Sequence, residues 1–376
     1  MRAIIVKEFR QLRRDPRTLA MLFLLPFLFL VVFGYAASFD IKQVPTAVLG
    51  PEAGLVAAAL PRQFHVVSTD AGGDAGVARD VLRRGEAVVA IVTPATGEAP
   101  RAFIDGTELF AAQAALRSLA EARAVGTGAP GAGGASSPAP APASAGTSTG
   151  GPVASARVDV LFNPELRTAV IMIPGLCGII LVFVGTVATA LGVVRERQSG
   201  TMEQLAVMPF RPRDVFFGKI APYLIIAAAD MIIVVVAGML LFDVPFRGSV
   251  ATFALGAALF LFVTLGIGVL ISTVSQTQGQ AIQLAMMTML PQFLLSGLFF
   301  PLYSMPWGVR WIGYLLPLTY FIKVARGTMV RGAPIGALWL PLLVLAVMAA
   351  VVFTASTLRF RRDLAPAGGA FEVEDS

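Results

Sequence analysis

The sequence predicts an α-helical polytopic membrane protein with six transmembrane helices, an N-terminal amphipathic helix and a small α/β extracytoplasmic domain. Composition is the first observation behind this fold class. Of the 376 residues, 56% are hydrophobic and only 14% are charged, whereas soluble domains carry about 25% charged residues. The mean hydropathy is +0.77. The other two observations are long uncharged stretches and three clusters of basic residues that flank some of them. This composition excludes a soluble enzyme, a disordered chain and a coiled coil.

Six segments have the roughly 20 predominantly apolar residues that a helix needs to cross a bilayer. The uncharged stretch 248–309 is too long for one span, and its polar run at 272–280 divides it into two. The six predicted spans cover residues 18–38, 169–194, 220–242, 250–271, 281–302 and 332–358.

Basic residues decide the orientation, because cytoplasmic loops of membrane proteins carry an excess of Lys and Arg. Clusters lie before the first span, between the second and third, and after the sixth: Arg2, Lys7, Arg10, Arg13, Arg14, Arg17; Arg195, Arg197, Arg211, Arg213, Lys219; Arg359, Arg361, Arg362. Six spans place all three clusters on one side, so both termini are predicted to be cytoplasmic. Four cations oppose this arrangement: Arg310, Lys323, Arg326 and Arg331.

Residues 1–17 are predicted to form an amphipathic helix on the cytoplasmic membrane surface. Ile5, Phe9 and Leu12 share one helical face, while basic side chains occupy much of the remainder, a pattern typical of interfacial helices. The first span follows directly, and its apolar core exceeds the roughly 7–15 residues of a secretory signal peptide. We therefore expect an uncleaved anchor.

Residues 39–168 form the predicted extracytoplasmic domain. Short β-like runs alternate with helical stretches, which is typical of an α/β sheet. The expected strands are 44–49, 64–67, 87–92 and a weaker 101–105, and the expected helices are 53–60, 74–84 and 108–124. Residues 126–156 contain almost only Gly, Ala, Pro, Ser and Thr, so we expect a flexible linker there.

Two further segments complete the predicted organisation. Residues 303–331 are broken by Pro306 and Pro317 and are too short to span the membrane twice, and their Trp and Tyr residues suit the outer membrane interface. Residues 359–376 form a cytoplasmic tail.

Few side chains offer metal or nucleophilic chemistry. The chain has one cysteine, Cys177, and one histidine, His65. We therefore expect no intrachain disulfide, no cysteine-based metal cluster and no multi-histidine metal site.

Polar groups inside the predicted spans are candidates for a substrate path. Asp230 is the one charge deep in a span, where a carboxylate is costly and must face protein or water. Thr288, Gln292 and Ser296 recur at every fourth residue and share one helical face. Asp230 either contacts substrate or a gate, or it is a structural partner for a hydroxyl or backbone group or a protonated acid. The other three residues either line the path or make hydrogen bonds to a neighbouring helix. These interpretations stay open.

The predicted cytoplasmic loop 195–219 carries the most distinctive local pattern. Thr201, with Gln204 three residues later, fits a capping box that begins a helix, and Pro209 stops this helix. Apolar side chains such as Leu205 suit docking into a groove on a soluble partner. An ordinary interfacial connector has the same features, so both interpretations remain.

The same loop resembles a known family. It reads Arg-Glu-Arg-x-x-Gly-Thr-x-Glu-Gln-Leu from position 195, followed by a Pro and by Gly-Lys at the next span. This pattern is similar to that of type-2 ABC exporter permeases, in particular multidrug-efflux-like members with a large extracytoplasmic domain after the first span. The remaining matches cover nearly the whole chain except 126–156: Lys7-Glu8-Phe9-Arg10-Gln11, Asp15-Pro16, Asn163-Pro164-Glu165, Ser296-Gly297, Pro301 and Leu316-Pro317-Leu318-Thr319-Tyr320.

The resemblance implies a transport subunit that works as a homodimer or heterodimer and is powered by a separate cytoplasmic ABC ATPase. ATP and Mg would bind to that ATPase, and no cofactor is expected in this chain. In agreement, Gly218-Lys219 is followed by Ile220 and not by the Ser or Thr of a phosphate-binding loop. The loop between spans two and three would hold the coupling helix. The implied ATPase-coupling residues are Arg195, Glu196, Gly200, Thr201, Glu203, Gln204 and Leu205.

We therefore expect a non-enzymatic permease of a bacterial plasma (inner) membrane, with lipid contacts and no nucleic-acid partner. It would export drugs or other amphipathic substrates from the cytoplasm or inner leaflet, and segment 303–331 would form short re-entrant helices that close the pathway. An ion-coupled secondary transporter is one alternative, although Asp230 is thin support for ion coupling. A membrane-anchored sensor with an outer ligand domain is another, although it would need a cytoplasmic signalling domain.

Overall fold

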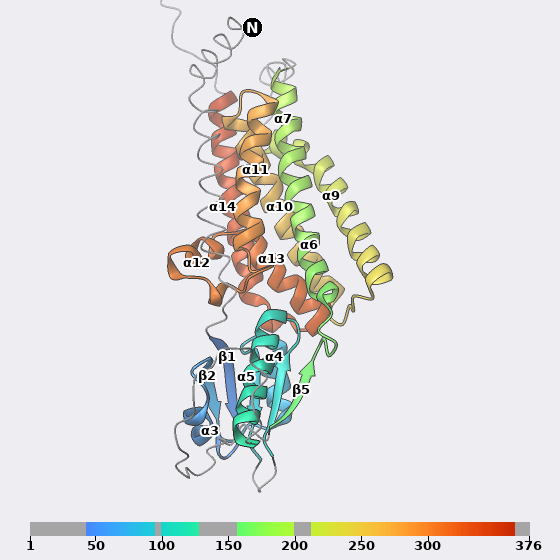
Figure 1. Cartoon of the computed structure of the whole chain (residues 1–376). Coiled ribbons are helices and arrows are strands. Elements are labelled where there is room, and N and C mark those ends of the chain that lie inside the picture. Colours follow the sequence, from blue (N-terminus) through green and yellow to red (C-terminus); the bar gives the residue numbers. More distant parts are fainter. Residues whose placement is uncertain (1–42, 95–98, 128–155, 199–211, 365–376) are drawn as a thin grey trace, which may run out of the picture.

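The computed structural model describes residues 43–94, 99–127, 156–198 and 212–364. These residues form two parts stacked end to end: an α/β domain and a helical bundle (Figure 1). The predicted helix 1–17, the span 18–38 and the tail from 365 lie outside the described residues, as does nearly all of the expected linker 126–156.

The α/β domain is built on a five-stranded mixed sheet with the strand order β2-β1-β3-β4-β5. Strand β1 runs parallel to both β2 and β3, β3 runs antiparallel to β4, and β4 runs parallel to β5. The strands are β1 Val44–Leu49, β2 Phe64–Asp70, β3 Val89–Val92, β4 Arg101–Asp105 and β5 Arg157–Leu161. The helices are α3 Ala53–Ala59, α4 Ala75–Arg84 and α5 Leu109–Thr127.

Side-chain alternation along the strands gives the sheet two apolar faces. Ala47 and Leu49 of β1 point to the face covered by α4 and pack with Leu82. Val48 points to the opposite face, where α3 and α5 supply the core. The domain is therefore a three-layer α/β structure, as the alternation of strands and helices predicts.

The sequence analysis did not predict strand β5. β5 pairs in parallel with β4 at the edge of the sheet, but its exposed Arg157 and Asp159 interrupt the apolar pattern. Because it begins directly after the Gly/Ala/Pro-rich stretch, composition gives no sign of the strand.

The bundle is centred on α10, which contacts α6, α7, α9, α13 and α14. Phe260 of α10 stacks on Phe321 of α13 with ring centroids 4.4 Å apart, in the middle of the largest apolar cluster. The long helices are α6 Thr168–Phe183, α7 Thr189–Gln198, α9 Pro212–Phe242, α10 Val250–Val274, α11 Gln278–Leu295 and α14 Trp339–Leu364. The shorter ones are α12 Trp307–Tyr314, α13 Pro317–Arg326, the π-helices η1 Val184–Ala188 and η3 Gly327–Arg331, and the 3₁₀ turns η2 Leu302–Ser304 and η4 Ile335–Ala337.

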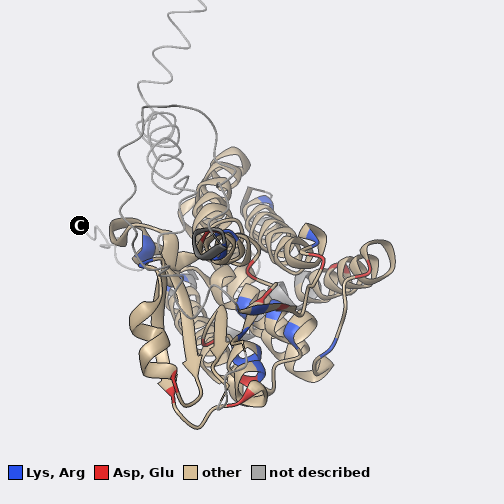
Figure 2. Ribbon diagram, turned by 60° about the horizontal axis from the view of Figure 1, so that its bottom comes forward, with Lys and Arg blue, Asp and Glu red and all other residues tan. Residues whose placement is uncertain are grey.

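Four of the described helices are long and apolar enough to cross a membrane: Thr168–Arg195, Leu224–Phe242, Val250–Val274 and Trp339–Arg359. Helix α11 occupies most of the predicted span 281–302, but it carries four glutamines and Pro291 and is not among these four. Charged residues are sparse along the helices, whose ribbon is mostly tan (Figure 2). Apolar side chains such as Leu240 of α9, 76% exposed, point outward as expected for a lipid-facing surface.

The predicted sixth span begins seven residues too early. Gly332 adopts a left-handed conformation with φ of 65° and Pro334 follows it, so the chain turns before α14 begins at Trp339. A proline and a left-handed glycine are ordinary helix breakers, and the uncharged sequence around them hides the turn.

Gly268 lets two helical segments of the bundle approach each other closely. A Cβ at this position of α10 would lie 2.7 Å from the Thr186 carbonyl oxygen and 2.9 Å from Thr189 Cβ. Gly268→Ala should therefore lower the free energy of unfolding by about 1–3 kcal/mol, because the neighbouring backbone must move. Gly308 of α12 has no atom near its Cβ position, so Gly308→Ala is the matched control and should be neutral or slightly stabilising. Thermal unfolding of both purified variants is the measurement, and equal midpoints would contradict this packing.

Candidate functional site

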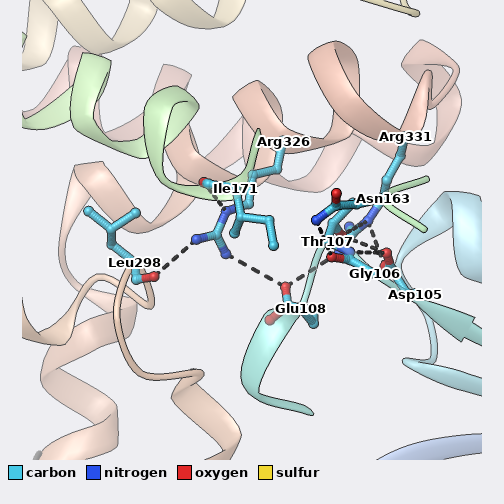
Figure 3. Close-up of polar contacts among 9 residues, drawn as sticks. All are labelled: Asp105, Gly106, Thr107, Glu108, Asn163, Ile171, Leu298, Arg326 and Arg331. Carbon is cyan, nitrogen blue, oxygen red and sulfur yellow. Dashed lines mark hydrogen bonds and ion pairs between the residues drawn. The ribbon is translucent and has the colours of Figure 1, made fainter. Parts of the chain in front are cut away.

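A cluster of buried charges joins the two parts of the molecule (Figure 3). Arg331, the last residue of η3, forms an ion pair with Asp105 at the end of β4, with 2.9 Å between Nε and Oδ2. Its Nη2 also lies 3.4 Å from Oε1 of Glu108. The Asp105 side chain is fully buried, so this pair is shielded from water and from salt screening.

Arg326 of α13 extends the cluster into the helical bundle. Its Nη1 lies 3.8 Å from Glu108 Oε1. Its Nε donates to the Ile171 carbonyl at 3.3 Å, and its Nη2 donates to the Leu298 carbonyl at 3.0 Å. Arg326 is only 5% exposed. Its guanidinium therefore connects α6, the loop that follows α11, and the α/β domain. Desolvation lowers the pKa of Arg326 below the usual arginine value, and the nearby Glu108 opposes this shift.

The turn after β4 is shaped to present the two carboxylates. Asp105 Oδ1 accepts hydrogen bonds from the backbone N–H of Thr107 at 2.9 Å and from its hydroxyl at 2.7 Å. Asn163 fixes the same turn, because its Nδ2 donates to the Gly106 carbonyl at 3.3 Å and to the Arg167 carbonyl at 3.1 Å. Asn163 thus links the turn to the start of α6.

The sequence analysis did not select Asp105 and Glu108 as site residues. Asp105 and Glu108 end one predicted strand and begin the next predicted helix, where polar residues are common. Their partners Arg326 and Arg331 lie more than 200 positions later in the chain. Only the excess of cations in 303–331, which had no local carboxylates to balance it, hinted at a distant acidic partner.

A cavity of about 360 Å³ lies beside the charge cluster. The α/β domain contributes the turn after α4, with Gly85 and Glu86. The bundle contributes Tyr303, Lys323 and other residues from the 296–341 region. The cavity is thus built by both parts, next to the contacts that hold them together.

Asp230 lies in α9 beside Ala227 and Met231, which pack into the main apolar cluster with Cys177 of α6. Its Oδ2 is buried and has no hydrogen-bond partner among the described residues. The structure therefore places this carboxylate within the bundle and shows no structural hydrogen bond to that oxygen in the described region.

The three candidate residues of α11 and its C-cap, Ser296, behave differently from one another. The Thr288 hydroxyl donates to the Leu284 carbonyl of its own helix at 2.9 Å. Gln292 and Ser296 are buried, and within the described ranges neither Gln292 Oε1 nor Ser296 Oγ has a hydrogen-bond partner. Ser296 borders the 360 Å³ cavity, so α11 reaches that cavity at its C-terminal end.

The predicted coupling residues lie mostly outside the described part. Arg195 is exposed near the end of α7, and Glu196 lies in the same helix. Gly200, Thr201, Glu203, Gln204 and Leu205 fall within residues 199–211, which the structure does not describe.

The fold and its charge cluster define an integral membrane protein in which an α/β domain is clamped to one end of an apolar helical bundle. The chain belongs to the ABC-2 family of transporter proteins, whose family model matches residues 16–358. It is a permease of that family, a non-catalytic transmembrane subunit located in the inner membrane. Membership of this family excludes the two alternatives, an ion-coupled secondary transporter and a membrane-anchored sensor.

Named relatives support this membership. The chain is 26% identical to the "Probable multidrug ABC transporter permease YbhS" of Escherichia coli K12 over 343 residues, which cover 88% of this chain and 89% of the relative. It is 33% identical to "Inner membrane transport permease YhhJ" of the same strain, over 57% of each chain. "Probable multidrug ABC transporter permease YbhR" of that strain is 32% identical over 54% of this chain and 55% of its own length. No solved structure matches the chain.

Proposed function

We propose that the chain exports drugs or other amphipathic molecules from the cytoplasm or inner leaflet, as one half of a dimeric permease driven by a separate ATPase. The observation that carries this proposal is the similarity to a permease named for multidrug transport along 88% of the chain. Similarity to both YbhS and YbhR supports a second permease chain, either a copy or a paralogue. ATP and Mg bind to the ATPase.

The proposed topology has six spans, with helix 1–17, loop 195–219 and tail 359–376 in the cytoplasm and the α/β domain outside. The buried ion pairs support it, because Arg326 and Arg331, two of the four cations that oppose it, pair with carboxylates of the α/β domain. Helix α11 serves as the fifth span, shielded in part by α6, α7 and α10. Helices α12 and α13 are the re-entrant pair, at the end of the bundle that faces the α/β domain.

ATP-driven movement would enter through Arg195, Glu196, Gly200, Thr201, Glu203, Gln204 and Leu205 in the coupling loop. Substrate would pass Asp230, Thr288, Gln292 and Ser296. The buried oxygens of Asp230, Gln292 and Ser296, which no described group satisfies, support this path because buried polar groups ordinarily have partners.

The test of the function is dye accumulation in cells. Cells that express the permease with its ATPase should accumulate less of an amphipathic cationic or neutral dye than cells that express either subunit alone. Equal accumulation with and without the permease, while both proteins reach the membrane, would contradict export of this substrate class.

Asp230→Asn tests the substrate path. The amide retains the size of the side chain and removes a charge that is costly inside a bilayer, so membrane insertion and thermal stability should equal those of the wild type. Dye export should fall, since the carboxylate no longer faces the path. Asp243→Asn, which changes an exposed carboxylate at the end of the same helix, is the control. Wild-type export by Asp230→Asn would remove Asp230 from the path.

A further inference from the structure

The 360 Å³ cavity between the α/β domain and the bundle is large enough to hold a ligand. Its volume lies at the small end of the roughly 300–1,000 Å³ range of ligand pockets. The ion-paired residues Arg326 and Arg331 are part of the lining of the cavity, and their side chains do not occupy its volume.

The charge around the cavity is unbalanced. Five cationic side chains border it, against the two carboxylates of Glu86 and Glu108. Arg84 pairs with Glu86 at 3.1 Å, and Arg326 and Arg331 are engaged in the buried cluster. The two remaining cations are Arg310 and Lys323.

Arg310 and Lys323 form no ion pair within the described part of the chain; both instead contact an aromatic ring. The Arg310 guanidinium lies 5.7 Å from the centre of the Tyr314 ring, and Lys323 Nζ lies 6.0 Å from it. Arg310 Nε also donates to the Tyr314 hydroxyl at 3.0 Å. Two cations that form no ion pair in the described ranges, at the border of one cavity, create a positive potential that attracts an anion.

Hydroxyl groups complete the polar side of the cavity. Ser296 is 2% exposed, and neither its Oγ nor the buried Tyr303 hydroxyl has a hydrogen-bond partner in the described ranges. Both residues border the cavity. Burial raises the pKa of Tyr303 well above its usual value, so its hydroxyl stays protonated and can donate. A buried hydroxyl without a partner costs free energy, and an acceptor bound in the cavity would recover it.

Apolar side chains also line the cavity, close to aromatic residues of the kind found at a membrane surface. Ile322, Leu338 and Leu340 line it, and Leu340 lies in the first turn of α14. The adjacent Trp339 and the 82% exposed Trp307 of α12 project outward, as aromatic residues do at membrane–water interfaces. An apolar chain in this part of the cavity would therefore lie close to lipid.

We propose that this cavity binds a small anionic amphiphile, with its carboxylate-like head group held by Arg310, Lys323 and the two hydroxyls, and with its apolar part against Ile322 and Leu338. The occupant is an acidic cargo at the outer end of the pathway, an assignment that rests on the proposed export function. Binding itself requires neither ATP nor transport.

Binding of radiolabelled decanoate to the full-length chain in phosphatidylcholine nanodiscs tests the proposal, with empty nanodiscs as the background. Decanoate should bind saturably, whereas decanol and decyltrimethylammonium should not compete with it. Lys323→Gln and Arg310→Gln should each weaken decanoate binding about tenfold or more, because a charge-assisted hydrogen bond is lost. Lys323→Arg should retain binding. Arg62→Gln, which removes an exposed cation that does not border the cavity, should leave it unchanged.

Several results would overturn the proposal. They are decanoate binding no greater than in empty nanodiscs, equal competition by decanol, or wild-type affinity in both Gln variants. A thermal unfolding midpoint equal to that of the wild type will show that a Gln variant is folded. If a Gln variant is not folded, Lys323→Arg provides a comparison that retains the charge.

A second arm distinguishes a membrane lipid from a free amphiphile. If an anionic phospholipid head group fills the cavity, adding phosphatidylglycerol to the nanodiscs should reduce decanoate binding in the wild type. If the occupant is a free amphiphile, decanoate binding should be the same in both lipids. Because neither arm includes ATPase or dye, failure of binding leaves the export test unaffected, and failure of export leaves the binding result intact.

Discussion

Arg331→Met should lower the stability of the contact between the α/β domain and the helical bundle by roughly 3–5 kcal/mol, the usual cost of removing one member of a buried ion pair. The reason is that Asp105, fully buried and paired with Arg331 at 2.9 Å, would lose its ion-pair partner inside the protein. The thermal unfolding midpoint of the purified full-length protein should fall clearly, and limited proteolysis should cut faster between the two parts.

Two variants complete this experiment. Combining Arg331→Met with Asp105→Asn removes both charges and should restore much of the stability, because a neutral replacement of a buried ion pair is tolerated. Arg83→Gln breaks an exposed pair with Asp80 that is 3.8 Å long, and exposed pairs contribute only about 0–1 kcal/mol. An Arg331→Met protein as stable as Arg83→Gln would show that the buried cluster does not hold the domain.

Leu205→Asp should abolish functional coupling to the ATPase while leaving the protein inserted in the membrane. If the helix that begins at Thr201 docks into a groove of the ATPase, its apolar side chain is the energetic centre of that contact. A carboxylate buried there without a partner is costly. The permease should then lose co-purification with the ATPase or lose the stimulation of ATP hydrolysis by substrate.

Leu205→Met is the matched control, since it keeps an apolar side chain of similar volume and should preserve both properties. Normal ATPase binding and normal export by Leu205→Asp would mean that loop 195–219 is a plain connector.

Much of the fold follows from local patterns in the sequence. The strands Val44–Leu49 and Arg101–Asp105 have their predicted bounds, because each is a short run of residues suited to a buried strand, bounded by turn signals. The span at 250–271 begins where α10 does, after the Ser249 N-cap. The start of α14 and strand β5 were not predicted, since a turn within an uncharged stretch and a strand with alternating charges leave no clear hydrophobic period.

The candidate site was much less predictable. Asp230 and Ser296 could be selected because polar groups in an apolar span are conspicuous. Asp105 and Glu108 could not, since acidic residues in a loop are ordinary and their role depends on contacts with η3 and α13. The cavity likewise depends on how residues from two parts of the chain come together, which no local pattern encodes.

Reconstitution of the permease and its ATPase in proteoliposomes tests the central claim, that this chain moves amphipathic molecules at the expense of ATP hydrolysed by another subunit. With Mg-ATP on the ATPase side, a fluorescent amphipathic dye should accumulate in the vesicle lumen. Accumulation should require both proteins and stop when a non-hydrolysable ATP analogue replaces ATP. Dye movement by the permease alone under an ion gradient, or no movement while the bound ATPase hydrolyses ATP, would contradict the claim.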